Sequence, residues 1–382
     1  MNKRNPFSSK KRFVLSLLSF IAMLVLFAFF NDYAPLIVKK SYQKMFSPCF
    51  VTHKDSLEKL LRNGIVSSLE EKYVCDHSII YEKTFFQYLL SRRKISVYEY
   101  GEYGLLLHNA YQYAKKRNDF ELLNLVKRNF DEGFIKQSRD LVRTDQATYG
   151  NVAIDLYQEY GDSSYKKIAD DLYKNLAKQD SIDGLILYRY GRTHQSVDVI
   201  GLTSPFLFYY AKVFHNHSAY TMAEKMVLNY VKYGTDYTSG IPAQKYNLKT
   251  HFKKGMSNWG RGISWYLMGV MGVDSLNEED SIMVSKLENS LLQNKNLLYP
   301  QYMGDDSDID LSATIPILYY LNYRKLINLS AERYAKLISP FIDTDGIIRF
   351  CTPSIALPSE RPNAFQTSIA FQGLALLLLC EL

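Results

Sequence analysis

Residues 197–234 read VDVIGLTSPFLFYYAKVFHNHSAYTMAEKMVLNYVKYG and predict two helices joined by a short polar turn. The first half is almost wholly apolar, and the turn falls at residues 215–218. Met222, Met226 and Tyr230 then recur every four residues before Gly234. A spacing of four places apolar side chains on one face of a helix, and glycine commonly ends one. This stretch is therefore typical of a helical hairpin.

The same unit recurs along the chain. Val152, Leu156 and Tyr160 precede a turn at Gly161, and a second apolar stripe follows within residues 165–176. No extended stretch alternates apolar and polar residues as a half-buried strand would. Further hairpins are expected in three more ranges, and a last helix near the end could pair with an early one: 103–130, 259–293 and 311–338, then 365–379 with 57–90.

The length and number of the repeats favour one fold class. Hairpins recur roughly every 50 to 60 residues and number about six, which is longer than the usual solenoid repeat. Hairpins that close on themselves form an all-α (α/α)6 toroid, the six-hairpin barrel. An open helical solenoid is the competing architecture, and periodicity alone does not separate the two.

The first thirty residues predict a membrane anchor. Five cations within residues 1–12 precede an uncharged apolar run at 13–30, which as a helix would span roughly 27 Å. Residues 31–35 offer no clear pair of small residues for cleavage, so we expect a retained signal anchor rather than a removed signal peptide. The cytoplasmic basic flank would be 1–12, the transmembrane helix 13–30, and the single barrel domain 31–382. The positive-inside rule places that domain on the outer side of the cytoplasmic membrane.

Charge and cysteine content exclude several classes of protein. The net charge is +7, but five of the positive charges lie in the basic flank, which leaves +2 for the remainder and little for nucleic acid to bind. The four cysteines lack the close pairs of a zinc site. The acidic segment 305–310 lacks the glycine and terminal glutamate of a calcium loop, so we interpret it as a solvated loop. Neither a phosphate-binding loop nor a nucleophile elbow is present.

Three charged residues share one phase of the repeat, which means that they occupy the same position in successive hairpins. Asp145, Asp198 and Arg261 each stand at or near the start of the first helix in consecutive hairpins, and a closed ring would bring them to one mouth. An aspartate at a helix start is also a common cap. Asp198 runs directly into apolar residues, and a partly buried carboxyl there should hold its proton as a general acid must. His194, four residues earlier, could reach the same mouth.

Residues 258–265 read NWGRGISW and contain the pattern W-x-R-G-x-x-W. This pattern resembles the signature of glycoside hydrolase families 88 and 105, the unsaturated glucuronyl and rhamnogalacturonyl hydrolases, which are (α/α)6 barrels. Asp198, between two valines and followed by Pro205, is similar to the segment that carries their catalytic aspartate. Asp145, with Tyr149 and Gly150 after it, resembles the segment of a second aspartate. The resemblance covers residues 145–270.

This resemblance implies roles for individual residues. Asp198 would protonate the C4–C5 double bond of a terminal unsaturated uronic acid and activate water at C5, and Asp145 would position the sugar. Arg261 and Trp265, four apart on one helical face, would offer a cation and a stacking plane. Further substrate contacts are expected from four residues, Trp259, Gln244, Tyr149 and His194. The resemblance implies neither a metal nor an organic cofactor.

One departure from the family bears on activity. Gln244 takes the place of a histidine that the families usually carry, and a glutamine cannot transfer a proton, although the neighbouring Lys245 would suit an acidic sugar. The sequence thus predicts a glycosidase acting on unsaturated uronic-acid oligosaccharides, or alternatively a non-catalytic carbohydrate-binding or assembly protein of a cell-surface polysaccharide system. An ordinary hydrolase or lyase on the same toroid and a scaffold without sugar affinity remain further alternatives.

Overall fold

The computed structural model describes residue 11 and eight stretches of the chain: residues 13–28, 48–70, 101–136, 143–179, 181–187, 193–304, 308–352 and 369–382, with the side chain of Ile369 left aside. It divides into two compact units, Met1–Phe46 with Asp76–Lys94, and Ser47–Cys75 with Ile95–Leu382.

The first unit contains the predicted anchor. Residues 13–28 are helical there, and their large apolar side chains, such as Phe13 and Val25, are exposed. Among the described residues, no helix has both the length and the apolar character needed to cross a bilayer. The structure therefore does not support the predicted transmembrane helix at 13–30, of which residues 29 and 30 lie outside the described part. The predicted domain boundary at residue 31 also lies outside it.

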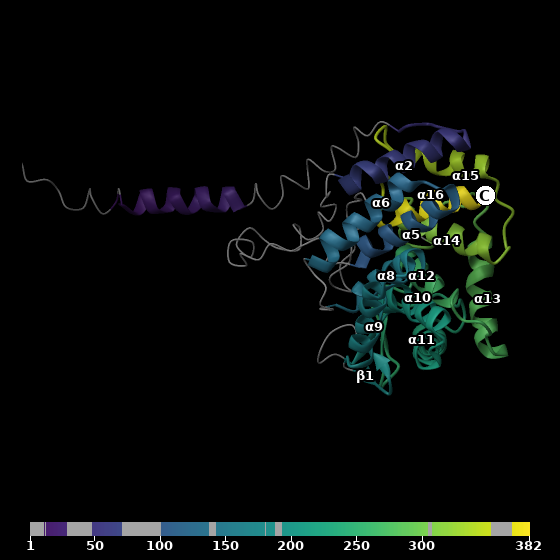
Figure 1. Ribbon diagram of the computed structural model, residues 1–382. Helices are drawn as coiled ribbons and strands as arrows, with labels where there is room; N and C mark the ends of the chain where they lie inside the picture. Colours follow the sequence, from purple (N-terminus) through teal and green to yellow (C-terminus); the bar gives the residue numbers. More distant parts are fainter. Residues whose placement is uncertain are drawn as a thin grey trace, which may run out of the picture. The chain divides into compact units, whose positions relative to one another are not determined.

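The second unit is a closed ring of helices. Its described residues contain six inner helices: α5 (Gly101–Arg117), α8 (Thr148–Tyr160), α10 (Val197–Phe214), α12 (Gly260–Val270), α14 (Leu311–Tyr323) and α16 (Ile369–Glu381). Each contacts the next, and α16 contacts α5 again (Figure 1). The predicted (α/α)6 toroid is thus confirmed, and the open solenoid is excluded because the first and last inner helices meet.

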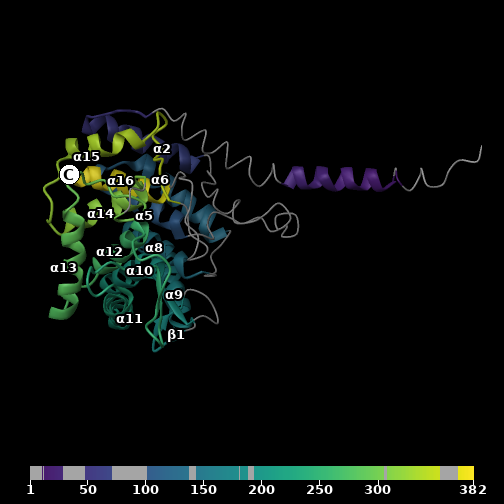
Figure 2. The same ribbon diagram turned by 180° about the vertical axis from the view of Figure 1, so that it is seen from behind.

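An outer layer of helices surrounds the ring: α2 (Lys54–Glu70), α6 (Phe120–Asn129), α9 (Ser163–Ala177), α11 (His217–Asn229), α13 (Glu278–Leu292) and α15 (Ala331–Ile338). Short turns extend three of them, the π-helices η2 (Phe130–Ile135) and η4 (Tyr230–Gly234) and the 3-10 helix η5 (Ser339–Phe341). The predicted pairing of the last helix with an early one is observed, because α16 packs against α2. Figure 2 shows α8, α10 and α12 side by side from behind.

The burial of each helix follows its layer. Outer helix α9 buries one stripe, which contains Tyr165, Ala169 and Leu172, whereas inner helix α10 is buried on nearly all sides because neighbours cover it. The turn between α8 and α9 forms as the sequence predicts. Gly161 ends α8 with φ 67°, and the Asp162 carboxylate accepts from the Ser164 amide at 2.8 Å.

Two very small sheets interrupt the helices in the described part of the chain. β1 (Ser181–Ile182) pairs with β2 (Leu185–Ile186), while β3 (His194–Ser196), β4 (Lys245–Asn247) and β5 (Lys253–Lys254) form an antiparallel sheet in that order. The all-α prediction omits these strands, which are too short to show alternation. The second sheet matters because it holds the start of α10: the Val197 amide donates to the Gln244 carbonyl at 3.0 Å.

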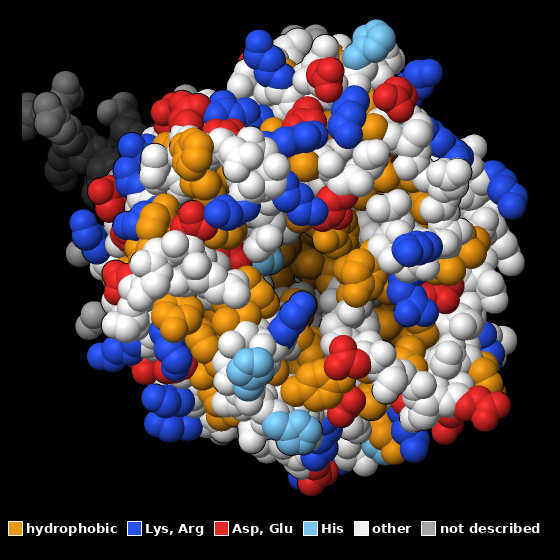
Figure 3. All heavy atoms as spheres, turned by 45° about the vertical axis from the view of Figure 1, so that its right-hand side comes forward, with side chains coloured by type: hydrophobic (Ala, Val, Ile, Leu, Met, Phe, Trp, Pro, Cys, Tyr) orange, Lys and Arg blue, Asp and Glu red, His pale blue; other side chains and the backbone are white. Residues whose placement is uncertain are grey.

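Close packing fixes the inner helices against one another. A Cβ on Gly201 of α10 would lie 2.6 Å from the Cα atom of Trp265 in α12, so only glycine allows this approach. One face of the molecule is hollowed at its centre, where hydrophobic side chains gather and charged ones stand around the rim (Figure 3).

Candidate active site

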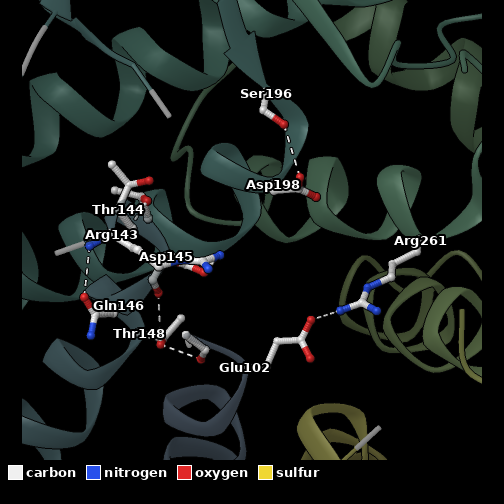
Figure 4. A network of polar contacts seen from close by, with 11 residues as sticks. Glu102, Arg143, Thr144, Asp145, Gln146, Thr148, Ser196, Asp198 and Arg261 are labelled. Carbon is white, nitrogen blue, oxygen red and sulfur yellow. Dashed lines mark hydrogen bonds and ion pairs between the residues drawn. The ribbon is translucent and has the colours of Figure 1, made fainter. Parts of the chain in front are cut away.

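Charged side chains from successive inner helices meet where these helices begin. Asp198 and Arg261 are the second residues of α10 and α12, and Asp145 lies in the 3-10 turn η3 (Thr144–Ala147) just before α8. Glu102 is the second residue of α5, and Asp310 is the N-cap of α14. Figure 4 shows Glu102, Asp145, Asp198 and Arg261 around one region. The structure thus brings together the three residues whose shared phase the sequence showed.

Asp198 combines burial with a changed proton affinity. Loss of hydration and, to a smaller extent, the negative charges of Asp145 and Glu102 raise the pKa of its carboxyl, which reaches about 6 against an ordinary value of 3.8. The positive charge of Arg261 and the Ser196 hydroxyl, which donates to Oδ2 at 3.1 Å, oppose this shift only in part. Asp198 is only partly exposed. It can therefore hold a transferable proton near neutral pH.

Asp145 is held by a cation of its own. Both carboxylate oxygens accept from the guanidinium of Arg143, Oδ1 from Nε at 3.0 Å and Oδ2 from an Nη atom at 2.8 Å. The Asp145 carbonyl lies against Gly101, where a Cβ would come within 2.0 Å of it, so α5 and η3 are in close contact. This two-point ion pair fixes the orientation of the carboxylate beside Asp198.

Arg261 is a buried cation that is already engaged by the protein. The side chain is only 2% exposed, and it donates to the Thr352 carbonyl at 2.6 Å and to the Glu102 carboxylate. Its guanidinium lies 5.5 Å from the centroid of the Trp265 ring and 5.3 Å from that of Phe371. The charges of Asp198 and Asp310 also act on it. Arg261 therefore balances several carboxylates at the base of the site.

Three predicted substrate contacts lie inside the protein instead. Trp265 is 1% exposed and packs against both Arg261 and Phe371, and Trp259 is 3% exposed at the start of α12. Tyr149 is fully buried and stacks on Phe134, with ring centroids 4.1 Å apart. In this structure these rings support the residues around them, and Trp265 holds the guanidinium of Arg261 in place rather than presenting a free face to a sugar.

Gln244 and His194 belong to the small sheet beside the site. The Gln244 side chain is buried against Gly255, where a Cβ would lie 2.3 Å from Oε1, and its backbone carbonyl holds the start of α10. Oε1 has no hydrogen-bond partner among the described residues. His194 is partly exposed in β3, opposite Asn247 in β4. Both therefore lie next to the segment that carries Asp198.

The sequence interpretation missed two members of the cluster. Glu102 has the same place in α5 that Asp198 has in α10, so the repeat phase could have identified it. Asp310 was interpreted as part of a solvated acidic loop. The structure contradicts this, because Asp310 is fully buried and accepts from the Ser312 hydroxyl at 2.6 Å and from the Thr352 amide at 3.1 Å. Its position directly before the apolar helix of residues 311–323 was the available signal.

Comparisons with known proteins agree with the fold. A family model described as Glycosyl Hydrolase Family 88 matches residues 83–295, more than half of the chain. A family 105 glycoside hydrolase from C. acetobutylicum ATCC 824 has 18% sequence identity over 85% of this chain and 98% of its own, with a TM-score of 0.64. A possible family 105 member from Salmonella enterica subsp. enterica serovar Paratyphi A str. ATCC 9150 has 15% identity over 86% and 94%, with a TM-score of 0.68.

An unsaturated glucuronyl hydrolase specific for heparin is also similar, with 13% identity over 86% of this chain and 97% of its own and a TM-score of 0.60. Identities this low show a shared fold and no more. No significant match was found among curated protein sequences.

Proposed function

Because this chain belongs to glycosyl hydrolase family 88, we propose that it hydrolyses oligosaccharides that end in an unsaturated uronic acid, with Asp198 as the acid that begins the reaction. The carboxyl of Asp198 carries this proposal. Burial raises its pKa to about 6. The carboxyl lies at the start of α10, and a second carboxylate, Asp145, is close enough to affect this pKa. A general acid needs such a pKa, near the working pH.

The proposed reaction starts on the double bond of the sugar. Protonated Asp198 gives its proton to C4, which breaks the C4–C5 double bond and leaves positive charge at C5, shared with the ring oxygen. The carboxylate that remains then removes a proton from a water molecule as the water attacks C5. The resulting hemiketal opens, and the glycosidic link is lost. Asp198 ends the cycle protonated, so no other proton donor is required.

The neighbours of Asp198 have separate roles in this proposal. Asp145, fixed by Arg143, favours the protonated form of Asp198 through its negative charge and offers acceptor oxygens to sugar hydroxyls. Arg261 limits the shift, because its positive charge favours the ionised form that activates water. These opposing charges keep the pKa of Asp198 at a value that allows both the protonated form, which donates to C4, and the ionised form, which activates water.

The test is spectroscopic. Hydration of the double bond removes the ultraviolet absorbance of unsaturated oligosaccharides, so the wild-type chain should abolish this signal and Asp198→Asn should not. Asp171→Asn, at an exposed position on outer helix α9, is the matched control and should retain full activity. If the wild type leaves the absorbance unchanged across unsaturated glucuronyl and rhamnogalacturonyl substrates, the proposed activity is wrong.

The alternative function is carbohydrate binding without turnover. Two observations favour it, the glutamine at 244 in place of the family histidine and the engagement of Arg261 by Glu102. A binding protein would bind acidic oligosaccharides with equal affinity as wild type and as Asp198→Asn, and neither form would change the absorbance.

We also propose a location outside the cytoplasmic membrane, with residues 13–30 as the tether. The basic flank before this segment and the exposed apolar side chains of residues 13–28 support it. Deleting residues 1–30 should release the protein from the membrane fraction of cells. A full-length chain that is recovered without membranes would exclude the tether.

A further inference from the structure

A second group of polar side chains lies toward the other end of the ring. The inner helices begin at the proposed active site, so their last turns lie opposite it. Lys116, in the last turn of α5, pairs with Glu381 at the end of α16. Figure 1 marks the C terminus at this end, and Figure 3, which brings that side forward, shows the hollow at its centre. The hollow therefore opens at the end of the ring opposite Asp198.

One face of α10 connects the proposed acid with this hollow. Within residues 197–211, the residues that are not buried are Asp198, Pro205 and Tyr209. Spacings of seven and four place them on one helical face. Outer helix α11 and the neighbouring inner helices cover the other sides of α10, so this face turns to the centre of the ring. Tyr209 lies about 16 Å beyond Asp198 along the helix axis.

Three more inner helices have partly exposed residues beyond their first turns. Met268 is the one residue of α12 that is not buried, and Tyr319 of α14 is partly exposed between buried neighbours. On α5, His108 and Gln112 are partly exposed and one turn apart. Burial and, to a smaller extent, the charge of Glu381 raise the pKa of the Tyr319 hydroxyl, which places this hydroxyl near the end of α16. These residues therefore line the hollow.

One buried carboxylate holds three side chains of this lining. Asp155 of α8 is only 1% exposed, and its Oδ2 lies 2.6 Å from Nδ1 of His108. Its Oδ1 accepts from Nε2 of Gln112 at 2.8 Å and from the Tyr209 hydroxyl at 2.9 Å. A buried charge of this kind often contributes no more to stability than apolar packing of the same volume. What it provides is a fixed orientation for the side chains that it holds, as a preorganised binding site requires.

Hydrogen-bonding atoms remain available in the lining. Nε2 of His108 and Oε1 of Gln112 have no hydrogen-bond partner among the described residues, and both side chains are partly exposed. The rings of Tyr209 and Tyr319 and the thioether of Met268 supply apolar surface beside them. A ligand that fits this lining must offer polar groups next to an apolar face.

The charges around the hollow restrict the charge of the ligand. The lysines in the last turn of α5 are already paired with carboxylates, Lys115 with Glu159 and Lys116 with Glu381. By contrast, Lys212 in the last turn of α10 has no ionic partner in the part of the chain that the structure describes, and it continues the face of α10 that turns to the centre. The hollow therefore suits a ligand that is uncharged or carries a single negative charge.

We propose that the hollow is a second sugar-binding site, in which His108 and Gln112 hydrogen-bond the hydroxyl groups of a saccharide and the Tyr209 ring packs on its C–H face. The choice of a sugar rests on the proposed function, because saccharides are the ligands that this chain is inferred to meet. A sugar fits the lining, since it combines hydroxyl groups with apolar ring faces. The site binds without catalysis and holds a saccharide while Asp198 acts at the opposite end of the ring.

The test follows the methyl group of Met268 by NMR in the full-length chain with isotope-labelled methionine methyl groups, and Met268→Leu assigns the signal. The probes are cellobiose, which is neutral, and the saturated disaccharide of glucuronic acid and glucose, which is acidic. Neither has a double bond to hydrate, so neither is consumed. At least one should shift the signal saturably, with a Kd on the order of 1 mM. If neither probe moves the signal at about 50 mM, the second site is overturned.

The two probes also identify the kind of sugar. Tighter binding of the acidic disaccharide that is lost in Lys212→Gln identifies an acidic saccharide as the ligand, because the one unpaired ammonium then supplies the difference. Affinities that do not depend on the charge of the probe identify a neutral saccharide, held by its hydroxyl groups alone.

Gln112→Ala should weaken binding roughly three- to tenfold, as expected for the loss of one hydrogen bond. Gln293→Ala is the matched control, because it makes the same change at an exposed position at the end of outer helix α13, and its Kd should stay within about twofold of the parent. Equal losses in the two variants, or no loss in Gln112→Ala, would overturn the site. If Gln112→Ala does not fold, Tyr319→Ala, which leaves the partners of Asp155 in place, should weaken binding instead, and an unchanged Kd would have the same meaning.

The second site and the proposed function fail separately. Asp198→Asn should bind the disaccharides at Met268 with an unchanged Kd, because the hollow lies at the opposite end of the ring. A weaker Kd in that variant would assign the shift to the active site and overturn the second site. Binding at Met268 by a chain that leaves the absorbance of unsaturated oligosaccharides unchanged would keep the second site and reject the hydrolase. Absorbance loss without any change at Met268 would do the reverse.

Discussion

Replacing Asp198 by asparagine should make the protein more stable at neutral pH, although it removes the proposed acid. Burial raises the pKa of this carboxyl from 3.8 to about 6, which means that the folded protein disfavours the ionised form. The contribution of the protonated carboxyl to stability is fully present below pH 3.8 and is lost as the pH rises through about 6. Asparagine carries no charge at any of these pH values, so the variant does not lose this stability as the pH rises.

The size of the effect follows from the shift. Each pKa unit corresponds to 1.36 kcal/mol, so a change from 3.8 to about 6 gives about 3 kcal/mol at pH 7.5 and nearly nothing below pH 4. Domains are commonly stable by only about 5 to 15 kcal/mol, so the gain should be readily measured. The difference between the two pH values isolates ionisation from any change in packing or hydrogen bonding.

Urea unfolding of the wild type and of Asp198→Asn at pH 4 and pH 7.5, followed by circular dichroism, gives the two free energies. Asp171→Asn on α9 serves as the control, because it makes the same substitution at an exposed position. If Asp198→Asn gains no more stability at pH 7.5 than at pH 4, the carboxyl is not desolvated as the structure indicates, and the general-acid argument loses its basis.

Four further outcomes are expected. The value of kcat/KM should fall about tenfold per pH unit above pH 6, as the protonated fraction of Asp198 falls, and a flat profile to pH 8 would contradict this. Glu102→Gln should move that decline to lower pH, because the Glu102 charge raises the pKa of Asp198, and carboxyl NMR titration reports the shift. Ser196→Ala should move it to higher pH, because the lost hydrogen bond favoured the ionised form, and an unchanged titration would show that the bond is not formed. Gly201→Ala should lower stability by about 1 to 3 kcal/mol or more in urea unfolding, because the added methyl meets the backbone of Trp265, and an unchanged midpoint would refute that contact.

The helices were predictable because each carries its own local signal. The apolar run and the polar turn after it bound α10 at Val197 and Phe214, as the structure shows. Closure of the ring was predictable only as a possibility, since it depends on contacts between α16 and α5, far apart in the sequence. The strands β3, β4 and β5 have three residues or fewer, so periodicity cannot reveal them.

The site residues that occupy the same position in successive repeats were predictable. Asp145, Asp198 and Arg261 share that phase, and the ring brings them together. Asp310 was missed because the acidic residues before it favoured a solvated loop, whereas its own burial depends on partners such as Thr352, 42 residues away. The position of Trp265 was equally hidden, since its burial follows from the close approach of α10 and α12 at a glycine.

The joining of the two ends of the barrel sets the order in which it can be completed. Gln372 of α16 donates to the carbonyl of Gly346 at 2.6 Å, and α16 packs on α2 and α5. During synthesis α2 and α5 emerge early, and their apolar flanks stay uncovered until the segment around residues 369–381 arrives. Closing a ring through contacts between distant parts of the sequence is slow, and apolar surfaces stay exposed until it is complete. A chain whose synthesis ends before this segment would therefore stay open and prone to aggregation. A fusion partner placed directly after the segment would hinder the final docking step.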